Sequence, residues 1–401
     1  MPSLTKLTIV GIPVALVVTQ FLQPKVELLG LSRTPVNLNN GHCQVIPGLE
    51  ACEDAWIHEA SGLAYLPCSN RESRLNWVPA MLHLNASALP TYSTDAVHIY
   101  DFATNSHRKL SITNLPAASQ GIYVHAIDVW VDSVDSKKLT VFLNSHRPPL
   151  EREKSAEVGA SSVIEIFETT LGSDTMNWVQ TVEHELIRTP NNLVVTGPRS
   201  FYVSNDHRRK VHWARAVEFL HAEKSDIVYC DASGAQATCI VAADGLIYPN
   251  GIAKGPNSLL YSASSLVGNI RVWEAQEDHT LNLVEEVHLP RPTDNIHVSP
   301  NGEVYAACFS RVLDLVASST RDGQEMGVVS PTEVWRMSNH SGVEEDRGSK
   351  FAMSLAFADD GKIMSGATTA APYKNKLLLT GGGDLHIALS EEGEPWVALG
   401  D

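Results

Sequence analysis

The segment from residue 249 to 273, Pro249-Asn-Gly-Ile-Ala-Lys-Gly-Pro-Asn-Ser-Leu-Leu-Tyr-Ser-Ala-Ser-Ser-Leu-Val-Gly-Asn-Ile-Arg-Val-Trp273, holds a complete copy of a unit that recurs along the chain. A polar doublet, Pro249-Asn250, opens a short apolar strand, and after a turn a second strand ends at Tyr261. A third strand of alternating character runs from Asn269 to Trp273. Short strands bounded by Gly, Pro, Asn and Ser predict an all-β fold.

Both halves of this unit are found elsewhere in the sequence. The alternating strand has six copies, at Val97–Tyr100, Val163–Phe167, Asp226–Tyr229, Asn269–Trp273, Glu333–Trp335 and Asp384–Ala388. The doublet and its hairpin are found at Glu53-Asp54, Asn191-Asn192, Pro249-Asn250 and Asp294-Asn295, and more weakly at His125 and at Met353-Ser354. Six inner hairpins and six outer strands predict a six-bladed β-propeller. A pair of irregular β-sandwiches is the alternative.

Composition restricts the class of protein. The 401 residues include 46 acidic and 30 basic side chains, for a net charge of -16, which leaves no excess of positive charge to neutralise a phosphate backbone. With 43% hydrophobic and 19% charged residues, the chain has enough apolar surface to fold. We therefore exclude a nucleic-acid-binding protein and a disordered one.

The N-terminal region predicts entry into the secretory pathway. Residues 7–22 form an apolar stretch after Lys6, so residues 1–30 read as a signal peptide or signal anchor and 31–401 as the propeller domain. A buried N-terminal strand or helix is the alternative. We expect a secreted or membrane-anchored protein, with membrane association through this segment. Asn85 and Asn339 begin N-x-Ser sequons and are the candidate glycosylation sites.

Six cysteines are too few to form a disulfide framework in a chain of this length. Cys230 and Cys239 flank a Gly/Ser/Ala-rich stretch, which predicts a hairpin with a disulfide across it. The pairing of the other four is left open: Cys43, Cys52, Cys68 and Cys308. Residues 206–224 interrupt the strand pattern and predict a short helix, as a lid over the channel, a membrane-surface helix or a solvated loop.

The doublets predict a calcium site. In a propeller the innermost strand of each blade lines the central channel, so equivalent positions converge at one end. These positions carry the oxygen donors Glu53, Asn191, Asn250, Asp294 and Asn295. Calcium takes six to eight such oxygen ligands, whereas zinc prefers His and Cys. A single doublet would indicate only a turn.

A histidine pair belongs to the same region. His125 occupies the doublet position of the second repeat, and His146 lies at the end of the strand that pairs with it. Two imidazoles beside a cation could act as a general base and its orienting partner. The alternative is a packed, hydrogen-bonded histidine.

The ordered set of motifs resembles the paraoxonase/arylesterase family of six-bladed propellers. The resemblance rests on Gly48–Asp54, Pro190-Asn-Asn, Ser204–His207, Pro249–Ile252 and Asp294–Val298, and runs from about Cys43 to the C-terminus. It implies that Glu53, Asn191, Asn250, Asp294 and Asn295 hold a catalytic Ca2+. A second, structural calcium would lie around Asp54, the carbonyl of Ile127 and Asn192. His125 and His146 match the histidine pair of the family, and Tyr248 matches an aromatic wall residue.

Three departures from the family pattern affect these expectations. Asn192 replaces an Asp, so the second calcium is expected to be weak or absent. Cys43 matches a cysteine that the family ties to one near the C-terminus, but no Cys follows Cys308, so ring closure must depend on strand pairing. Phe309 replaces a His and alters the acyl-side pocket.

The resemblance implies a calcium-dependent hydrolase of lactones or aryl esters. The cation would polarise the carbonyl, and water would be activated by His125 with His146 or by Asp294. Two alternatives are a non-catalytic calcium-stabilised scaffold and a strictosidine synthase-like propeller enzyme.

Overall fold

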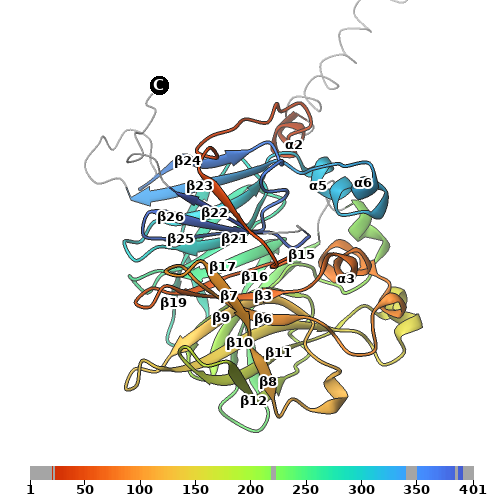
Figure 1. The fold of residues 1–401 in the computed structure, drawn as a ribbon, viewed down its shortest axis with the longest axis vertical. Coiled ribbons are helices and arrows are strands. Elements are labelled where there is room, and N and C mark those ends of the chain that lie inside the picture. The colour runs from red at the N-terminus through yellow and green to blue at the C-terminus, as the bar shows by residue number, and fades with distance from the viewer. Residues whose placement is uncertain (1–19, 21–22, 218–222, 340–349, 384–386, 392–401) are drawn as a thin grey trace, which may run out of the picture.

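The computed structural model describes residue 20 and residues 23–217, 223–339, 350–383 and 387–391. These residues form six antiparallel sheets arranged as the blades of a propeller, which confirms the predicted fold (Figure 1). The apolar N-terminal stretch lies outside the described residues, except for Gln20. Within the described part, no helix is long and apolar enough to cross a membrane.

The first three blades follow one another along the chain, and each has its innermost strand first. Blade 1 consists of β2 (Trp56–His58), β3 (Leu63–Cys68), β6 (Ala96–Asp101) and β7 (Ser106–Lys109). Blade 2 consists of β9 (Val124–Val131), β10 (Lys138–Arg147), β11 (Ser161–Thr170) and β12 (Thr175–Val182), with β8 (Ser111–Thr113) parallel to β12. Blade 3 consists of β13 (Pro190–Gly197), β14 (Ser200–Asn205), β15 (Lys224–Asp231) and β16 (Thr238–Ile247).

The last three blades include the one that closes the ring. Blade 4 consists of β17 (Pro249–Lys254), β18 (Leu260–Ser264), β19 (Asn269–Ala275) and β20 (Leu281–His288). Blade 5 consists of β21 (Thr293–Val298), β22 (Val304–Phe309), β23 (Thr332–Asn339) and β24 (Phe351–Asp359). Blade 6 consists of β25 (Thr369–Tyr373), β26 (Lys376–Thr380), β27 (Ile387–Glu391) and, from the start of the chain, β1 (Cys43–Ile46).

Ring closure therefore comes from strand pairing, as expected. Cys43 faces Ser390 across the antiparallel pair of β1 and β27, and its thiol is free. Cys308 is the other free thiol among the described residues. The remaining cysteines form two disulfides, the predicted Cys230–Cys239 and Cys52–Cys68.

One repeat was misassigned from the sequence. The doublet Met353-Ser354 lies on β24, the outermost strand of blade 5, and Gly361–Met364 is not a strand. The inner strand of blade 6 is β25, which begins at Thr369. Thr368-Thr369 offers hydroxyl groups where four of the other blades carry Asp, Asn or Glu and blade 2 carries His125, so it lacks the polar doublet pattern.

The core lies between neighbouring blades. Between blades 2 and 3, for example, Phe142 packs on Phe201 with ring centroids 5.6 Å apart, and Ile166 and Val203 are fully buried beside them. Apolar side chains on both faces of each sheet thus fix each blade against the next.

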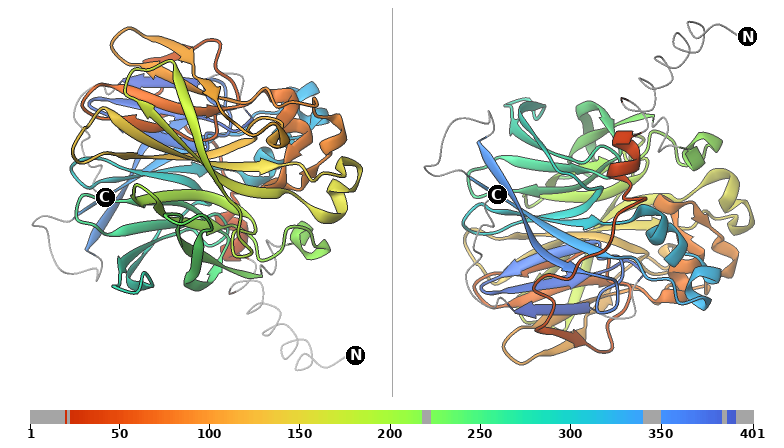
Figure 2. Two further views of the ribbon diagram at one scale, coloured as in Figure 1. Left: turned by 90° about the horizontal axis from the view of Figure 1, so that it is seen from below. Right: turned by 90° about the horizontal axis from the view of Figure 1, so that it is seen from above.

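Short helices gather on one side of the stacked blades (Figures 1 and 2). They include α3 (Arg71–Asn76), α5 (Val312–Ser318) and α6 (Arg321–Glu325), with β4 (Trp77–Val78), η2 (Pro79–Met81), β5 (His83–Leu84) and η3 (Ala86–Ala88) following α3. The other short elements are α2 (Gln23–Leu28), η4 (Ala117–Ser119), η5 (Arg152–Lys154), α4 (Ser155–Val158) and η6 (Trp213–Val217). Of these elements, α3 with the segment after it, α5 and α6 contribute to the walls of the pocket described below.

In the described residues of the insert at 206–224, the one helical element is the short 3-10 helix η6. Trp213 on it is 79% exposed, whereas Arg215 is buried and donates hydrogen bonds to the carbonyls of Pro79 and Ala80. Residues 218–222 lie outside the described part. The insert therefore packs against the wall segment η2 through Arg215.

Candidate active site

Four innermost strands carry the same irregularity at the predicted doublets. The register of β13 on β14 shifts between Pro190 and Leu193, that of β17 on β18 between Pro249 and Ile252, and that of β21 on β22 between Thr293 and Ile296. In blade 2 the register of β9 on β10 shifts across His125 and Ala126. A β-bulge leaves residues unpaired and re-aims their side chains, and bulges are frequent next to active sites. Each bulge here contains predicted site residues.

The bulges bring the predicted ligands of the first calcium together. Asn295 Nδ2 lies 3.0 Å from Glu53 Oε1, and Asn192 Nδ2 lies 2.5 Å from Asn295 Oδ1. Glu53, Asn191, Asn250 and Asp294 line one pocket and are 3% to 7% exposed. Residues from four blades thus share a single buried site.

Gly251 allows two of these strands to approach closely. A Cβ atom at this position would lie 2.7 Å from Asn295 Cα, from the carbonyl oxygen of Asp294 and from the nitrogen of Ile296. Only glycine fits such a contact without a shift of the backbone. Residue 251, directly after Asn250, must therefore be glycine for blade 4 to pack against blade 5.

The site presents oxygen atoms without hydrogen-bond partners. Asn250 Nδ2 donates to Ser265 Oγ at 2.9 Å, and Asn191 Nδ2 lies 3.5 Å from Asp206 Oδ2, so both amide oxygens are left for other contacts. Among the described residues, Asn191 Oδ1, Asn250 Oδ1 and Glu53 Oε2 are buried and have no hydrogen-bond partner. Buried polar atoms are almost always paired. This donor set fits a hard cation such as calcium.

The negative charges of the Glu53 and Asp294 carboxylates are buried, and nearby positive charge does not fully offset them. Burial, together with the charges of Asp294 and Asp54, raises the pKa of Glu53 well above its usual range, although Arg74 opposes the shift. Burial also raises the pKa of Asp294 to about 7. Within the described part of the chain, no group of three or more His, Cys, Asp or Glu side chains is placed to hold a metal ion. The predicted calcium ligands do not form such a group, because they combine two carboxylates with three amides.

The residues expected around a second calcium fit a cation less well. Asp54 Oδ1 accepts from the Ala55 N–H at 2.8 Å and from Thr369 Oγ1 at 3.3 Å. Asp54 Oδ2 accepts from the Ile127 N–H at 3.1 Å and from Asn192 Nδ2 at 3.4 Å. Both oxygens of this carboxylate are thus occupied by donors, and Ile127 contributes its N–H.

His125 and His146 lie beside the first set. Their ring centroids are 4.9 Å apart, and His125 Nε2 is 3.8 Å from Glu53 Oε1. His146 Nδ1 forms a 2.8 Å hydrogen bond with Ser162 Oγ. Burial lowers the pKa of His125 well below its usual range and that of His146 to about 4. Burial therefore favours the neutral form of both imidazoles, in which one ring nitrogen carries no proton.

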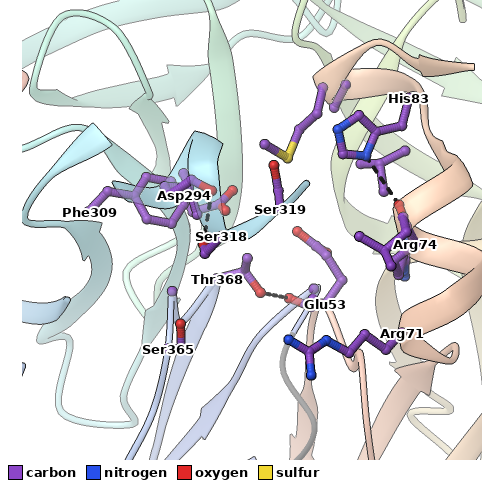
Figure 3. A pocket seen from close by; sticks show the side chains of 18 of the residues that line it. Glu53, Arg71, Arg74, His83, Asp294, Phe309, Ser318, Ser319, Ser365 and Thr368 are labelled. Atoms are coloured by element: carbon purple, nitrogen blue, oxygen red, sulfur yellow. Dashed lines mark hydrogen bonds between the residues drawn. The ribbon is translucent and has the colours of Figure 1, made fainter. Parts of the chain in front are cut away.

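A cavity of about 280 Å3 opens above this floor (Figure 3). Tyr248 and Phe309, the predicted wall residues, both line it. Tyr248 has φ of 45°, a left-handed backbone that is uncommon for a bulky residue and that directly precedes Pro249-Asn250. The wall opposite Phe309 comes from α3 and the segment after it, including Arg71, Arg74 and His83. Tyr248 adjoins this segment, since its hydroxyl lies 3.4 Å from the Ala80 carbonyl.

Sequence reasoning missed the residues that support this site. Asn144 Nδ2 donates to the Asn191 carbonyl at 2.9 Å, Ser204 Oγ to the Asn250 carbonyl at 2.6 Å, and Thr368 Oγ1 to the Glu53 carbonyl at 2.6 Å. Asn144 and Ser204 are near the ends of second strands, where a polar residue interrupts an apolar run. That interruption is the signal that could have identified them.

The described residues that line the cavity include neither of the predicted glycosylation sites. Asn85 is exposed at the start of η3. Asn339 is the last residue of β23, and the rest of its sequon lies outside the described residues.

Comparison with known proteins identifies relatives over nearly the whole chain. The family model described as Arylesterase matches residues 35–392. Serum paraoxonase/lactonase 3 of Oryctolagus cuniculus is 24% identical over 388 residues, covering 94% of this chain and 97% of the relative. Serum paraoxonase/arylesterase 2 of Homo sapiens is 23% identical over 395 residues, with the same coverage of 94% and 97%.

Among solved structures, the major Malassezia sympodialis allergen Mala s 1 has a similar fold. The TM-score is 0.51 at 12% identity, and the match covers 87% of this chain and 95% of the allergen. At this identity the similarity concerns the fold alone.

Proposed function

Since this chain belongs to the Arylesterase family, we propose that it hydrolyses carboxylic esters and lactones at the floor of the channel, with one bound calcium ion. Membership of this family, with paraoxonase, arylesterase and lactonase relatives, makes the chain a hydrolase of the esterase/lactonase class. The same membership favours this class over a non-catalytic scaffold or a strictosidine synthase-like enzyme.

The observation that carries the calcium proposal is the set of buried oxygen atoms without partners. Glu53, just before blade 1, and Asn191, Asn250 and Asp294, on the inner strands of blades 3, 4 and 5, line one cavity. Among the described residues, the first three of them each have a buried oxygen without a hydrogen-bond partner. Calcium bound there would act as a Lewis acid that polarises a substrate carbonyl. We propose one ion because both oxygens of Asp54, in the second set, already accept hydrogen bonds.

The histidine pair supplies a proton acceptor at the same floor. His125 is neutral, is buried beside Glu53, and has no hydrogen-bond partner on either ring nitrogen among the described residues. We assign it the role of general base toward water. His146, which Ser162 orients, supports the ring of His125 from 4.9 Å away. Asp294 is the alternative base or nucleophile.

The experiment is hydrolysis of phenyl acetate and δ-valerolactone by the purified full chain, with calcium and with a chelator. Chelation should abolish turnover and added calcium should restore it. Asn250→Ala should lower calcium affinity at least about tenfold, whereas Asn257→Ala, at an exposed turn of the same blade, should not change it. Full turnover in chelator would remove the metal from the mechanism.

The role of His125 can be separated from metal binding. His125→Gln should lower kcat and leave calcium affinity within about twofold, because His125 is not among the proposed ligands. Asp294→Asn should lower both. If His125→Gln keeps full kcat while Asp294→Asn loses it at saturating calcium, Asp294 is the base.

We further propose that the protein is secreted or membrane-anchored, with residues 1–30 as the signal segment. Two disulfides, Cys52–Cys68 and Cys230–Cys239, suit an oxidising compartment. On expression through a eukaryotic secretory pathway, N-glycosidase treatment should lower the mass of the wild type. The decrease should be smaller for Asn85→Gln, and an unchanged mass in the wild type would contradict glycosylation.

A further inference from the structure

The charged side chains that line the cavity are separated by sign. The acidic residues, Glu53 and Asp294, lie at the floor and belong to the proposed metal site. The basic residues of the lining are Arg71, Arg74 and Lys362. Lys362 is 79% exposed and pairs with Asp360. The cations that face the substrate space are therefore the two arginines.

Arg71 and Arg74 are held on one wall by α3. They are three residues apart, so they lie on the same face of this helix, and Figure 3 shows both on the side of the cavity opposite Phe309. The Asn70 side chain accepts from the Ser73 N–H at 2.9 Å, and the Arg71 N–H donates to Glu50 Oε2 at 3.1 Å. The wall is thus fixed independently of the two guanidinium groups.

Neither guanidinium forms an ion pair within the described residues. Within the described part, the one hydrogen bond of the Arg74 guanidinium goes to the Val124 carbonyl, at 2.8 Å, and this arginine is 7% exposed. Burial raises the pKa of Asp95 and of Glu53, and the charge of Arg74 opposes both shifts. Arg71 has no side-chain hydrogen bond there, and its Nε, like that of Arg74, is buried without a partner. Three other partly buried arginines do form ion pairs: Arg147 with Glu165, Arg188 with Asp226 and Arg291 with Glu333.

An arginine without a partner on the wall of a cavity indicates an anionic ligand. The planar guanidinium matches a carboxylate through two parallel hydrogen bonds, and desolvating it without a partner is unfavourable. The two carboxylates at the floor, Glu53 and Asp294, are not available as partners for the arginines once they bind a divalent cation. The rest of the wall is largely apolar and includes Leu75, Val78, Met81, Leu315 and Val328.

We propose that the substrate is an ester or lactone that carries a carboxylate. Arg71, supported by Arg74, binds this carboxylate while the reacting carbonyl lies over the floor formed by Glu53, Asn250 and Asp294. The apolar wall contacts the hydrocarbon part between the two ends. This inference rests on the proposed hydrolase function and specifies its substrate class.

The test compares two esters of the same size and different charge, 4-acetoxybenzoate and 4-acetoxybenzamide, with phenyl acetate as the reference substrate. The measured quantity is the ratio of kcat/KM for the benzoate to that for the benzamide. Arg71→Gln should lower this ratio about tenfold or more relative to wild type, mainly through KM, because it removes a charge-assisted contact. Differences in leaving-group reactivity cancel between the two enzymes.

Two further variants control for charge and folding. Arg71→Lys keeps the positive charge and should recover part of the ratio. Arg321→Gln removes an exposed arginine of α6 that pairs with Glu72 outside the cavity, and should leave the ratio unchanged.

An Arg71→Gln ratio equal to that of wild type, with phenyl acetate still hydrolysed, would overturn the substrate class alone. Failure of the wild type to hydrolyse all three esters in calcium would overturn the proposed function together with it.

Discussion

Removal of the Cys52–Cys68 disulfide should weaken calcium binding, while removal of Cys230–Cys239 should not. Cys52 directly precedes Glu53, and Cys68 is the last residue of β3. Glu53 is the proposed ligand that lies outside a strand, since β2 begins only at Trp56, whereas Asn191, Asn250 and Asp294 lie within strands. Thr368 Oγ1 and Thr369 Oγ1 hold its carbonyl, whereas the position of its N–H depends on a few local contacts.

Those contacts converge on the residues next to the disulfide. The Glu53 N–H donates to the Pro67 carbonyl at 3.3 Å, and Cys52 and Cys68 form an isolated β-bridge. Ala51, on the other side of Cys52, has φ of 51°, a left-handed backbone that an L-residue adopts at some cost. Without the covalent bond, this segment can relax away from the position that aims Glu53 into the channel.

The two disulfides have similar expected effects on stability. The sequence separation is 16 residues for Cys52–Cys68 and 9 for Cys230–Cys239. The chain-entropy relation gives about 3 kcal/mol for the first loop and about 2.6 kcal/mol for the second. A difference in calcium affinity between the two double variants is then not explained by global stability.

The assay is calcium titration by calorimetry, with thermal unfolding in chelator as the measure of metal-free stability. Cys52→Ala/Cys68→Ala should lower calcium affinity about tenfold or more, as loss of support for a ligand commonly does. Cys230→Ala/Cys239→Ala should lose comparable stability and keep its affinity within about twofold. Equal affinities in the two variants would refute the positioning argument.

Three other predictions follow from the site. Because the pKa values of Glu53 and Asp294 are raised, the folded metal-free protein binds protons that the unfolded chain has lost, so its stability should fall as pH rises from about 4 to above 7. Calcium affinity should increase over pH 6 to 8, because the two carboxylates lose their protons there. A pH-independent affinity would contradict this prediction. Elemental analysis should find one calcium ion per chain in wild type. The Asn192→Asp variant, which replaces a donor to Asp54 with a carboxylate, should bind two calcium ions. Two calcium ions in wild type would refute the single-ion proposal. Gly251→Ala should cost about 1 to 3 kcal/mol in the free energy of unfolding and weaken calcium binding, and an unchanged titration would show that the strands can separate without harm.

The sequence predicted the blades well because each blade repeats one local pattern. All six alternating strands belong to third strands of blades, from β6 to β27, although residues 384–386 of the last copy are not described. The pattern can be recognised locally, because alternation of apolar and polar residues indicates a half-buried strand whichever strands pair with it. The strand β1 carried no such signal. It became the outermost strand of blade 6 through a pairing across most of the chain.

The site could be predicted only where its residues occupy equivalent repeat positions. The doublets at Asn191, Asn250 and Asp294 were found because bulges recur at the same place in the inner strands. Arg71 and Arg74 were not found, because α3 belongs to an insertion between the second and third strands of blade 1, and the insertions at this place differ from blade to blade. Nothing in its sequence shows that it folds over the channel.

The difference between repeated strands and insertions also explains how the site combines a fixed floor with a specific wall. The floor depends on packing between blades, as the contact at Gly251 shows, so a change there affects metal binding and folding together. The wall is built from insertions outside the repeated strands. The Arg71 side chain makes no hydrogen bond within the described residues, so a change there should leave the ring of strands intact. Substrate preference can therefore diverge within this fold while the donor set stays the same, which is why the substrate class has to be argued from α3 and not from the bulged strands.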